Sequence, residues 1–197
     1  MKKAAHLTFL IIAICVFTST LSGCKRPNVL LNPYDYQPSI ASQSTYYKNK
    51  PIDLMWVVNR ANDTSIFYYY NPDGTVFYEA PPTMERYFTT VFEKALVSLG
   101  MKVSPPTQPA TGAPALQLTM LSMNDNRFVI QAQLYANRSI TFTKTYEIDG
   151  PPKPSGTSDG KPDINALRQR SYVMTNQTIK TVLADPKFKK AYKADIK

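Results

Sequence analysis

Residues 80–100 (APPTMERYFTTVFEKALVSLG) carry eight apolar side chains at three- and four-residue spacing. In a helix this spacing places all eight on one face, which must be buried against another layer of the protein. Thr83 suits the helix N-cap, Glu85 suits the positive first turn, and Gly100 suits the position after the helix end. The sequence therefore predicts an amphipathic helix with the core-facing residues Met84, Tyr87, Phe88, Val91, Phe92, Ala95, Leu96 and Leu99.

Strand patterns flank this helix on both sides. The sequence NPDG (71–74) lies between two aromatic runs and predicts a β-hairpin, because proline presets the first central turn position and glycine accepts a left-handed backbone. The hairpin strands are expected at 66–70 and 75–79. Alternation and composition predict further strands at 52–58, 101–103, 116–121, 127–136 and 138–148.

Two more helices are expected near the C-terminus. The first covers 163–183 and has an apolar face with polar interruptions. The second is short and basic and covers 185–194, with Asp185 and Pro186 as its N-cap and first residue. The last strands follow one another without long crossovers, so we expect one α+β domain over residues 52–197. It should contain a mainly antiparallel sheet of about five to six strands, two main helices on one face and a short C-terminal helix.

The first 23 residues have the features of an export signal. Lys2 and Lys3 precede an apolar run at 7–17, which is too short to span a bilayer, since a span takes roughly 20 apolar residues. We expect residues 1–23 to be a signal peptide that is removed, leaving no spanning segment. An ordinary signal peptide with an incidental Cys24 is the alternative.

The sequence LSGC at residues 21–24 resembles the lipobox of bacterial lipoproteins. The resemblance implies that signal peptidase recognises Leu21, Ser22 and Gly23 and cuts before Cys24. That cysteine then carries a thioether-linked diacylglycerol and an N-acyl chain such as palmitate, and several acyl chains together anchor a protein firmly. Lys25 stands where an Asp would resemble the inner-membrane retention signal. We therefore expect a lipid anchor in the outer membrane, with the protein facing the periplasm.

The segment 24–51 shows neither helical nor strand periodicity and is rich in proline and small polar residues. We expect it to be a flexible tether from Cys24 that spans about 30 Å as a coil. The alternative is that its tyrosines pack part of it onto the domain. Those tyrosines are Tyr34, Tyr36, Tyr46 and Tyr47.

Removal of the signal peptide leaves 174 of the 197 residues and lowers the formal charge from +9 to +7. It also removes His6, the only histidine, and Cys15. The mature chain then lacks the residues for Ser-His-Asp or Cys-His catalysis and for zinc bound by His or Cys. A carboxylate-pair hydrolase stays formally open, but the acidic residues form no motif. We expect a binding or assembly protein that is not an enzyme and has no metal and no cofactor beyond the acyl groups on Cys24.

The predicted hairpin carries aromatic side chains on both faces, because side chains alternate along a strand. Since the helices should cover one face only, the other face is either an aromatic docking surface or is covered by residues 24–51. The candidate docking residues are divided into two sets, one for each face: Tyr68, Tyr70 and Tyr78, and Phe67, Tyr69 and Phe77.

The C-terminal residues 187–197 contain five lysines and one aspartate. Four of the lysines are candidate contacts for anionic lipid, with Phe188 and Tyr192 packed on the domain: Lys187, Lys189, Lys190 and Lys193. The alternative is a solvated basic end. The net charge and the many tyrosines would also suit a nucleic-acid partner. We do not expect one, because an exported protein would not meet nucleic acid.

Residues 77–96 (FYEAPPTMERYFTTVFEKAL) are similar to ABC-type transport auxiliary lipoproteins, in which an aromatic-rich strand leads through a Pro-containing link into such a helix. The stretch from VFEKALVSLGMKV (91–103) through the antiparallel strands to TIKTVLADPKFKKAY (178–192) looks equally like the small uncharacterised lipoproteins of the YajG type. Neither family has catalytic residues to carry over. The resemblance implies a non-catalytic accessory or docking subunit of an envelope complex with a protein partner, in the first family a lipid-transport ABC system. The alternative is a ligand-binding lipoprotein for lipid head groups or cell-wall glycan.

Overall fold

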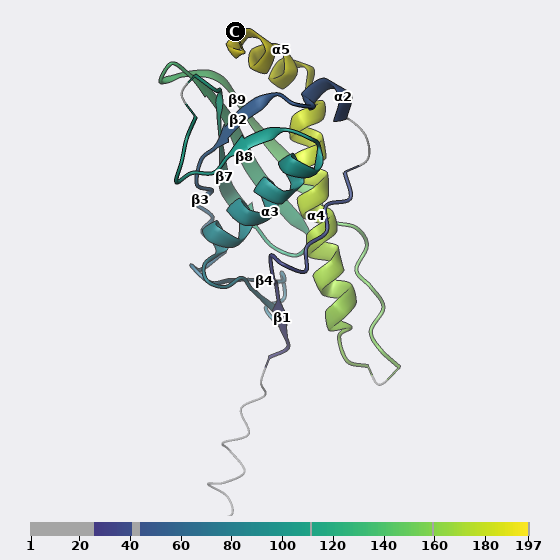
Figure 1. Ribbon diagram of the computed structural model, residues 1–197. Coiled ribbons are helices and arrows are strands. Elements are labelled where there is room, and N and C mark those ends of the chain that lie inside the picture. Colours follow the sequence, from purple (N-terminus) through teal and green to yellow (C-terminus); the bar gives the residue numbers. More distant parts are fainter. Residues whose placement is uncertain (1–25, 41–43, 111, 159, 197) are drawn as a thin grey trace, which may run out of the picture.

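The computed structural model describes residues 26–40, 44–110, 112–158 and 160–196. In these residues a six-stranded sheet carries two helices across one face, α3 (Met84–Ser98) and α4 (Ile164–Ala184), as Figure 1 shows. A short helix, α5 (Pro186–Asp195), follows α4. The predicted α+β class, the strand number and the helix arrangement are confirmed.

The larger sheet has the order β6-β2-β7-β8-β9, and β3 also pairs with β7. Its long strands β7 (Ala115–Met123), β8 (Arg127–Ala136) and β9 (Ser139–Asp149) are antiparallel, as predicted. The short strands are parallel to their neighbours, because a crossover through the hairpin and α3 returns the chain in the same direction. They are β2 (Pro51–Leu54), β3 (Val58–Asn59) and β6 (Lys102–Ser104).

The predicted hairpin is present as β4 (Tyr68–Tyr70) and β5 (Phe77–Glu79). The Asn71 N–H donates to the Val76 carbonyl at 3.1 Å, and Gly74 takes the left-handed conformation at φ +68°. The hairpin does not join the larger sheet. It forms a smaller sheet in which β1 (Asn28–Leu30) pairs with β5 in parallel.

The expectation of a flexible tether over 24–51 is wrong for its described part, residues 26–40 and 44–51. This part contains β1, the short helix α2 (Ser44–Tyr47) and the start of β2. Four of its side chains are fully buried: Val29, Leu31, Tyr36 and Tyr47. The Tyr36 hydroxyl donates to Asn176 of α4 at 2.6 Å. Burial of large aromatic side chains offsets the conformational entropy that the segment loses on ordering. The sequence does not predict this packing, because the tyrosines follow neither a helical nor a strand period.

Helices α3 and α5 begin at their predicted capping residues, and α4 begins one residue after the predicted start, with Asp163 as its N-cap. The Thr83 hydroxyl accepts a hydrogen bond from the Arg86 N–H at 3.2 Å, and the Asp163 carboxylate accepts one from Ala166 at 3.0 Å. Helix α5 begins at Pro186 with Asp185 as its N-cap, as the sequence predicts. Helix α4 buries polar residues as well as apolar ones. The hydroxyls of Thr175 and Thr178 donate hydrogen bonds to the backbone carbonyls four residues earlier.

The core lies between the helices and the inner face of the larger sheet, and an element closes it at each end. At one end Tyr69 of the small sheet meets Phe128 of β8 with ring centroids 6.0 Å apart. At the other end the Tyr192 hydroxyl of α5 donates to the Pro51 carbonyl at 2.7 Å. Figure 1 accordingly places β1 and β4 at the opposite end of the molecule from α5. Within the described residues, every helix is too short or too polar to cross a bilayer.

Candidate functional site

The hairpin register decides which of its aromatic residues are accessible. Tyr69 lies opposite Tyr78, and Tyr70 lies opposite Phe77, so each pair shares one face of the small sheet. Tyr69 and Tyr78 point inward and are 0% and 1% exposed, with their rings stacked at 4.6 Å. The Tyr69 hydroxyl lies 2.9 Å from the Ser171 hydroxyl of α4. Burial raises the pKa of both phenols well above their usual value.

The two predicted docking sets are therefore wrong in their membership. The predicted sets group Tyr78 with Tyr68 and Tyr70, and Phe77 with Tyr69, whereas the observed register puts Tyr78 on the face of Tyr69 and Phe77 on the face of Tyr70. Tyr69 and Tyr78 belong to the core. The outward residues of the small sheet are half-buried or exposed and include Leu30, Tyr68, Tyr70 and Phe77, which we call the outer aromatic face.

Rings of the outer aromatic face pack against one another. The Tyr68 ring contacts those of Tyr70 and Phe77 at centroid distances of 5.2 and 6.0 Å. The Arg26 guanidinium lies 5.8 Å from the Tyr70 ring centroid. Leu30 of β1 stays 45% exposed, and Phe67, which precedes β4, stays 51% exposed. The outward face of the small sheet thus carries a packed cluster of three rings, and the hydrogen-bonded pair Asn28 and Glu79 lies between these rings and Leu30. Two arginines adjoin it: Arg26 near Tyr70, and Arg168, whose Nε donates to the Leu30 carbonyl at 2.8 Å.

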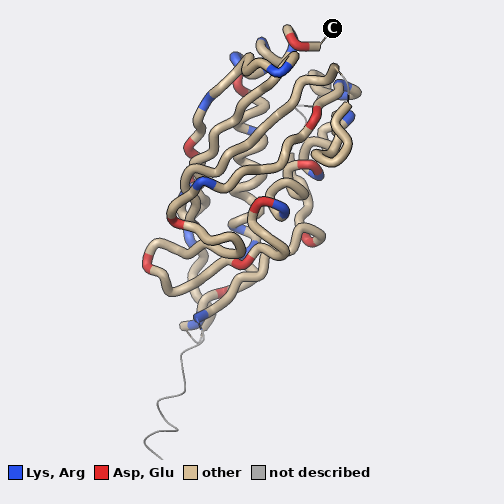
Figure 2. Tube along the Cα trace, turned by 90° about the vertical axis from the view of Figure 1, so that its left-hand side faces the viewer, with Lys and Arg blue, Asp and Glu red and all other residues tan. Residues whose placement is uncertain are grey.

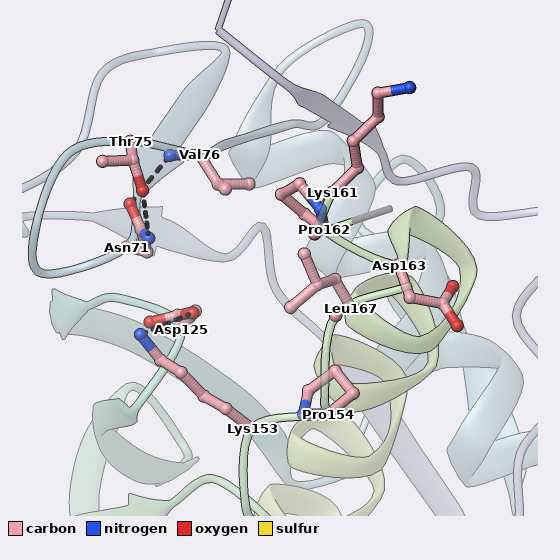
Figure 3. A pocket seen from close by; sticks show the side chains of 12 residues that line it. Asn71, Thr75, Val76, Asp125, Lys153, Pro154, Lys161, Pro162, Asp163 and Leu167 are labelled. Atoms are coloured by element: carbon pink, nitrogen blue, oxygen red, sulfur yellow. Dashed lines mark hydrogen bonds and ion pairs between the residues drawn. The ribbon is translucent and has the colours of Figure 1, made fainter. Parts of the chain in front are cut away.

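A pocket lies between the hairpin turn and the loop before α4 (Figure 3). It encloses about 250 Å³, and its walls include Asn71, Thr75, Asp125, Lys153, Pro154 and Leu167. Figure 3 shows the Lys153 side chain reaching toward Asp125, with the Nζ–Oδ2 distance at 3.7 Å. Sequence reasoning did not single out this cluster.

Asp125 is the main polar group of the pocket wall and is 3% exposed. Its Oδ2 accepts from the Tyr78 hydroxyl at 3.3 Å and lies 3.4 Å from Nη1 of Arg170. Its Oδ1 is buried and has no hydrogen-bond partner among the residues that the structure describes. A buried carboxylate oxygen without a donor is costly, and Asp125 is also one of the residues that line the pocket.

Arg170 of α4 supports this carboxylate from inside the protein and is 6% exposed. Its Nε donates to the Pro151 carbonyl at 2.6 Å, and Nη2 donates to Asn126 at 3.3 Å. Gly150 allows the close approach, because a Cβ there would lie 2.9 Å from Nη2 of Arg170. The signal in the sequence was the position of Arg170 on the predicted helix face that carries Leu167 and Met174, since a charge on such a face needs a partner.

The basic C-terminal residues lie on α5. Lys187, Lys190 and Lys193 are exposed, whereas Lys189 is half-buried with its Nζ 5.8 Å from the Tyr46 ring centroid. Phe188 and Tyr192 are fully buried. Figure 2 shows Lys and Arg positions around the end that carries the C-terminus, interspersed with acidic ones. Contact of these lysines with anionic lipid stays a prediction.

Asp185 joins α5 to the edge strand β9. Its Oδ2 accepts hydrogen bonds from Lys144 at 2.6 Å and from the Tyr146 hydroxyl at 3.0 Å. Burial opposes ionisation of this carboxyl, but the bonds from Lys144, the Lys187 N–H and Tyr146 outweigh it and lower the pKa of Asp185 to about 2. The ionised carboxylate of Asp185 thus holds α5 against the sheet.

The lipobox residues Leu21, Ser22, Gly23 and Cys24 lie outside the described residues. The first described residue is Arg26, and β1 starts at Asn28. Cys24 is therefore separated by only three residues from a strand that belongs to the folded domain.

No protein-family model matches the sequence, and no curated protein matches it. Among solved structures the fold is similar to that of protein XCC0632 from Xanthomonas campestris, described under the family model DUF330. The TM-score is 0.52 at 10% sequence identity, and the match covers 85% of this chain and 95% of that protein. A structure described as an uncharacterised protein matches with a TM-score of 0.48 at 12% identity, over 70% of this chain and 94% of that one. At 10% identity, the likeness to XCC0632 shows a common fold.

Proposed function

We propose that this chain is a lipid-anchored, periplasm-facing lipoprotein without catalytic activity, which acts as an accessory or docking subunit of an envelope complex. The observation that carries the proposal is the position of Cys24. It ends an LSGC sequence after an apolar run of signal-peptide length, and three residues later the first strand of the domain begins. Acyl chains on this cysteine would hold the domain directly at the membrane.

The kind of complex is suggested by residues 77–96, whose strand, Pro-containing link and helix are similar to ABC-type transport auxiliary lipoproteins. In this chain the corresponding elements are β5, the link 80–83 and α3. The proposal therefore includes a lipid-transport ABC system as the complex that is assisted. Lys25 after the lipidated residue favours the outer membrane.

The anchor is tested by the substitution Cys24→Ser, with Cys15→Ser as the matched control inside the signal peptide. We expect Cys24→Ser to abolish labelling with radioactive palmitate and to release the protein from the membrane fraction, while Cys15→Ser keeps both. The domain should still fold, because its described core residues begin at Val29. Retention of label and membrane attachment in Cys24→Ser would overturn the lipoprotein assignment.

The accessory role is tested by purification of the tagged full chain from solubilised membranes, with proteins and lipids analysed in the same eluate. Stoichiometric recovery of the membrane components of a transporter supports the proposed role. Recovery of lipid or glycan without a protein partner contradicts it.

That second result would favour a ligand-binding lipoprotein for lipid head groups or cell-wall glycan. The unpartnered Oδ1 of Asp125 beside Lys153 supports this candidate. A phosphoethanolamine head group would offer an ammonium to Asp125 and a phosphate to Lys153, and a glycan would offer hydroxyls. Calorimetric titration with glycerophosphoethanolamine and with soluble muropeptides tests it. Asp125→Asn should abolish the heat of binding, whereas Asp73→Asn in the exposed hairpin turn should not; absence of binding by the unmodified protein rejects the candidate.

A further inference from the structure

The outer aromatic face lies at the end of the molecule that is remote from α5. The inward face of the same sheet packs on the first residues of β8, through Tyr69 and Phe128, and on Ser171 of α4. Helix α5 follows the opposite end of α4, and its Asp195 accepts a hydrogen bond from Thr141 near the start of β9. The 21 residues of α4 span about 30 Å. From Ser171 to the start of α5 at Pro186 is 15 residues, or about 22 Å along the helix axis, and Figure 1 shows β1 and α5 at opposite ends of the molecule.

The composition of this face suits the interface between water and a bilayer. Tyrosine has an apolar ring and a polar tip, and tyrosine and tryptophan are enriched where membranes meet water. Tyr68, Tyr70 and Phe77 form one packed cluster, and Leu30 beside them is 45% exposed. Ile66 and Phe67, next to β4 in the chain, are 63% and 51% exposed.

The covalent chain limits how far this face can lie from Cys24. Only Lys25, Arg26 and Pro27 separate Cys24 from Asn28, the first residue of β1. Four residue steps span at most about 14 Å, even in a fully extended chain. The side chains of Asn28 and Leu30 belong to the outward face of the small sheet, in register with Phe77 and Glu79. An acyl chain on Cys24 therefore holds β1, and the face that carries Asn28 and Leu30, within about 14 Å of the point of attachment.

The charges beside the face are compatible with an anionic bilayer. Lys25 and Arg26 lie in the connecting residues, and Arg26 also stacks near Tyr70. Glu79 is the acidic residue of the face, and its carboxylate accepts a hydrogen bond from the Asn28 amide. Lys25 and Arg26 together outweigh the negative charge of Glu79, so the net charge near the point of attachment is positive.

We propose that the outer aromatic face rests in the headgroup region of the bilayer to which Cys24 is anchored. The face then holds the domain upright, with α5 directed away from the membrane. This inference rests on the proposed lipidation of Cys24. It assigns the face to lipid and not to a protein partner.

The test uses the lipidated full chain in vesicles of phosphatidylethanolamine and phosphatidylglycerol. Once Cys24 is acylated the mature chain has no other thiol, so a single introduced cysteine can carry a nitroxide label. The labelled positions are Leu30→Cys on the face, Thr145→Cys on the exposed side of β9, and Lys190→Cys on α5. Accessibility to oxygen, which partitions into lipid, is compared with accessibility to a water-soluble nickel chelate.

We expect the label at position 30 to be several-fold less accessible to nickel and more accessible to oxygen than the labels at 145 and 190. The triple variant Tyr68→Ser, Tyr70→Ser and Phe77→Ser should restore nickel access at position 30 while the protein stays attached. Equal nickel access at all three positions in vesicle-bound protein would overturn the proposal. A label at position 30 that becomes protected only when membrane proteins are added would also overturn it, in favour of a protein partner. Failure of the chain to attach at all would instead refute the lipid anchor.

Discussion

At the scale of single residues, neighbouring tyrosines of the hairpin differ in burial: one belongs to the core and the next lies at the surface. Tyr69 is buried against Tyr78, Phe128 and Ser171, whereas Tyr68 lies half-buried on the outer aromatic face. Loss of the Tyr69 ring would leave a cavity between the small sheet and α4 and an unpaired hydroxyl on Ser171. Loss of the Tyr68 ring would leave only a gap at the surface.

We predict that Tyr69→Ser lowers the free energy of unfolding by about 3–5 kcal/mol, because a large buried aromatic side chain is removed. The matched substitution Tyr68→Ser should cost less than about 1 kcal/mol. Urea denaturation of the mature chain, followed by circular dichroism, measures both. Similar losses for the two variants would mean that the hairpin faces are assigned wrongly.

The pKa of Asp185 predicts a loss of stability in acid. Its pKa is about 2 in the folded protein, against an ordinary value of 3.8 for an aspartate side chain. Because the folded value is the lower one, Asp185 stabilises the protein fully above about pH 4 to 5, and this contribution is lost as the pH falls toward 2. The difference corresponds to about 2 kcal/mol.

Asp185→Asn is the matched variant, since asparagine keeps the N-cap but has no charge. We expect it to be less stable than the unmodified chain at pH 7 and equally stable near pH 2. Denaturation midpoints measured between pH 7 and pH 2 give this comparison. Parallel curves over the whole range would exclude Asp185 as the group that titrates.

At the scale of elements, the features with local signals could be predicted. Thr83 and the Asp185-Pro186 pair mark helix starts by their own chemistry, and Gly74 marks the hairpin turn by its left-handed backbone. The pairing of β1 with β5 could not be predicted, because a three-residue strand has no measurable period and its partner lies 49 residues away in register. The hairpin faces were wrong for a similar reason, since a shift of one residue in register exchanges them.

The pocket was missed because its residues come from separate segments with no shared motif. Asp125 lies in the turn between β7 and β8, Lys153 in the loop before α4 and Arg170 on α4 itself. None of the three is unusual among its neighbours in sequence, except that Arg170 interrupts an apolar helix face. The fold alone brings their charges together.

Strand β1 gives a direct test of the packing of the N-terminal segment. Val29 is fully buried and its neighbour Leu30 is 45% exposed. Val29→Ala should lower the free energy of unfolding by about 2 kcal/mol, the value for lost buried methyl groups with a residual cavity. Leu30→Ala should cost less than about 0.5 kcal/mol. Urea titrations of both variants measure these changes. If residues 24–51 were a flexible tether, neither substitution would change the free energy of unfolding.

At the scale of the whole molecule, the distance between its ends separates two kinds of surface. The outer aromatic face adjoins the residues that follow Cys24, and α5 with its exposed lysines lies about 22 Å away along α4, counted from Ser171. Charges attract across water only over about 8 Å at physiological salt. In a chain anchored at Cys24, the lysines of α5 would thus lie beyond the field of the lipid head groups.

We therefore predict that neutralising Lys187, Lys190 and Lys193 together, each to Gln, leaves vesicle attachment of the lipidated chain and its salt dependence unchanged. Neutralising Lys25 and Arg26 is the matched comparison and should weaken the salt-dependent part of the attachment to anionic vesicles. Flotation of vesicles at two salt concentrations measures both. A salt-dependent loss in the α5 variant would restore those lysines as lipid contacts.

The packing of residues 26–40 and 44–50 along the domain also governs how an anchored copy would search for its partner. A domain on a long flexible coil can take up many distances from the membrane and many orientations, so it can contact partners over a wide range of positions. A domain whose chain enters the fold at residue 28, and whose outer aromatic face rests in the head groups as proposed, can only diffuse sideways and rotate about the membrane normal. Confinement to one layer with one orientation raises the effective concentration of any partner held in the same membrane. Such a lipoprotein is suited to neighbours in its own leaflet and would not bridge to a distant membrane.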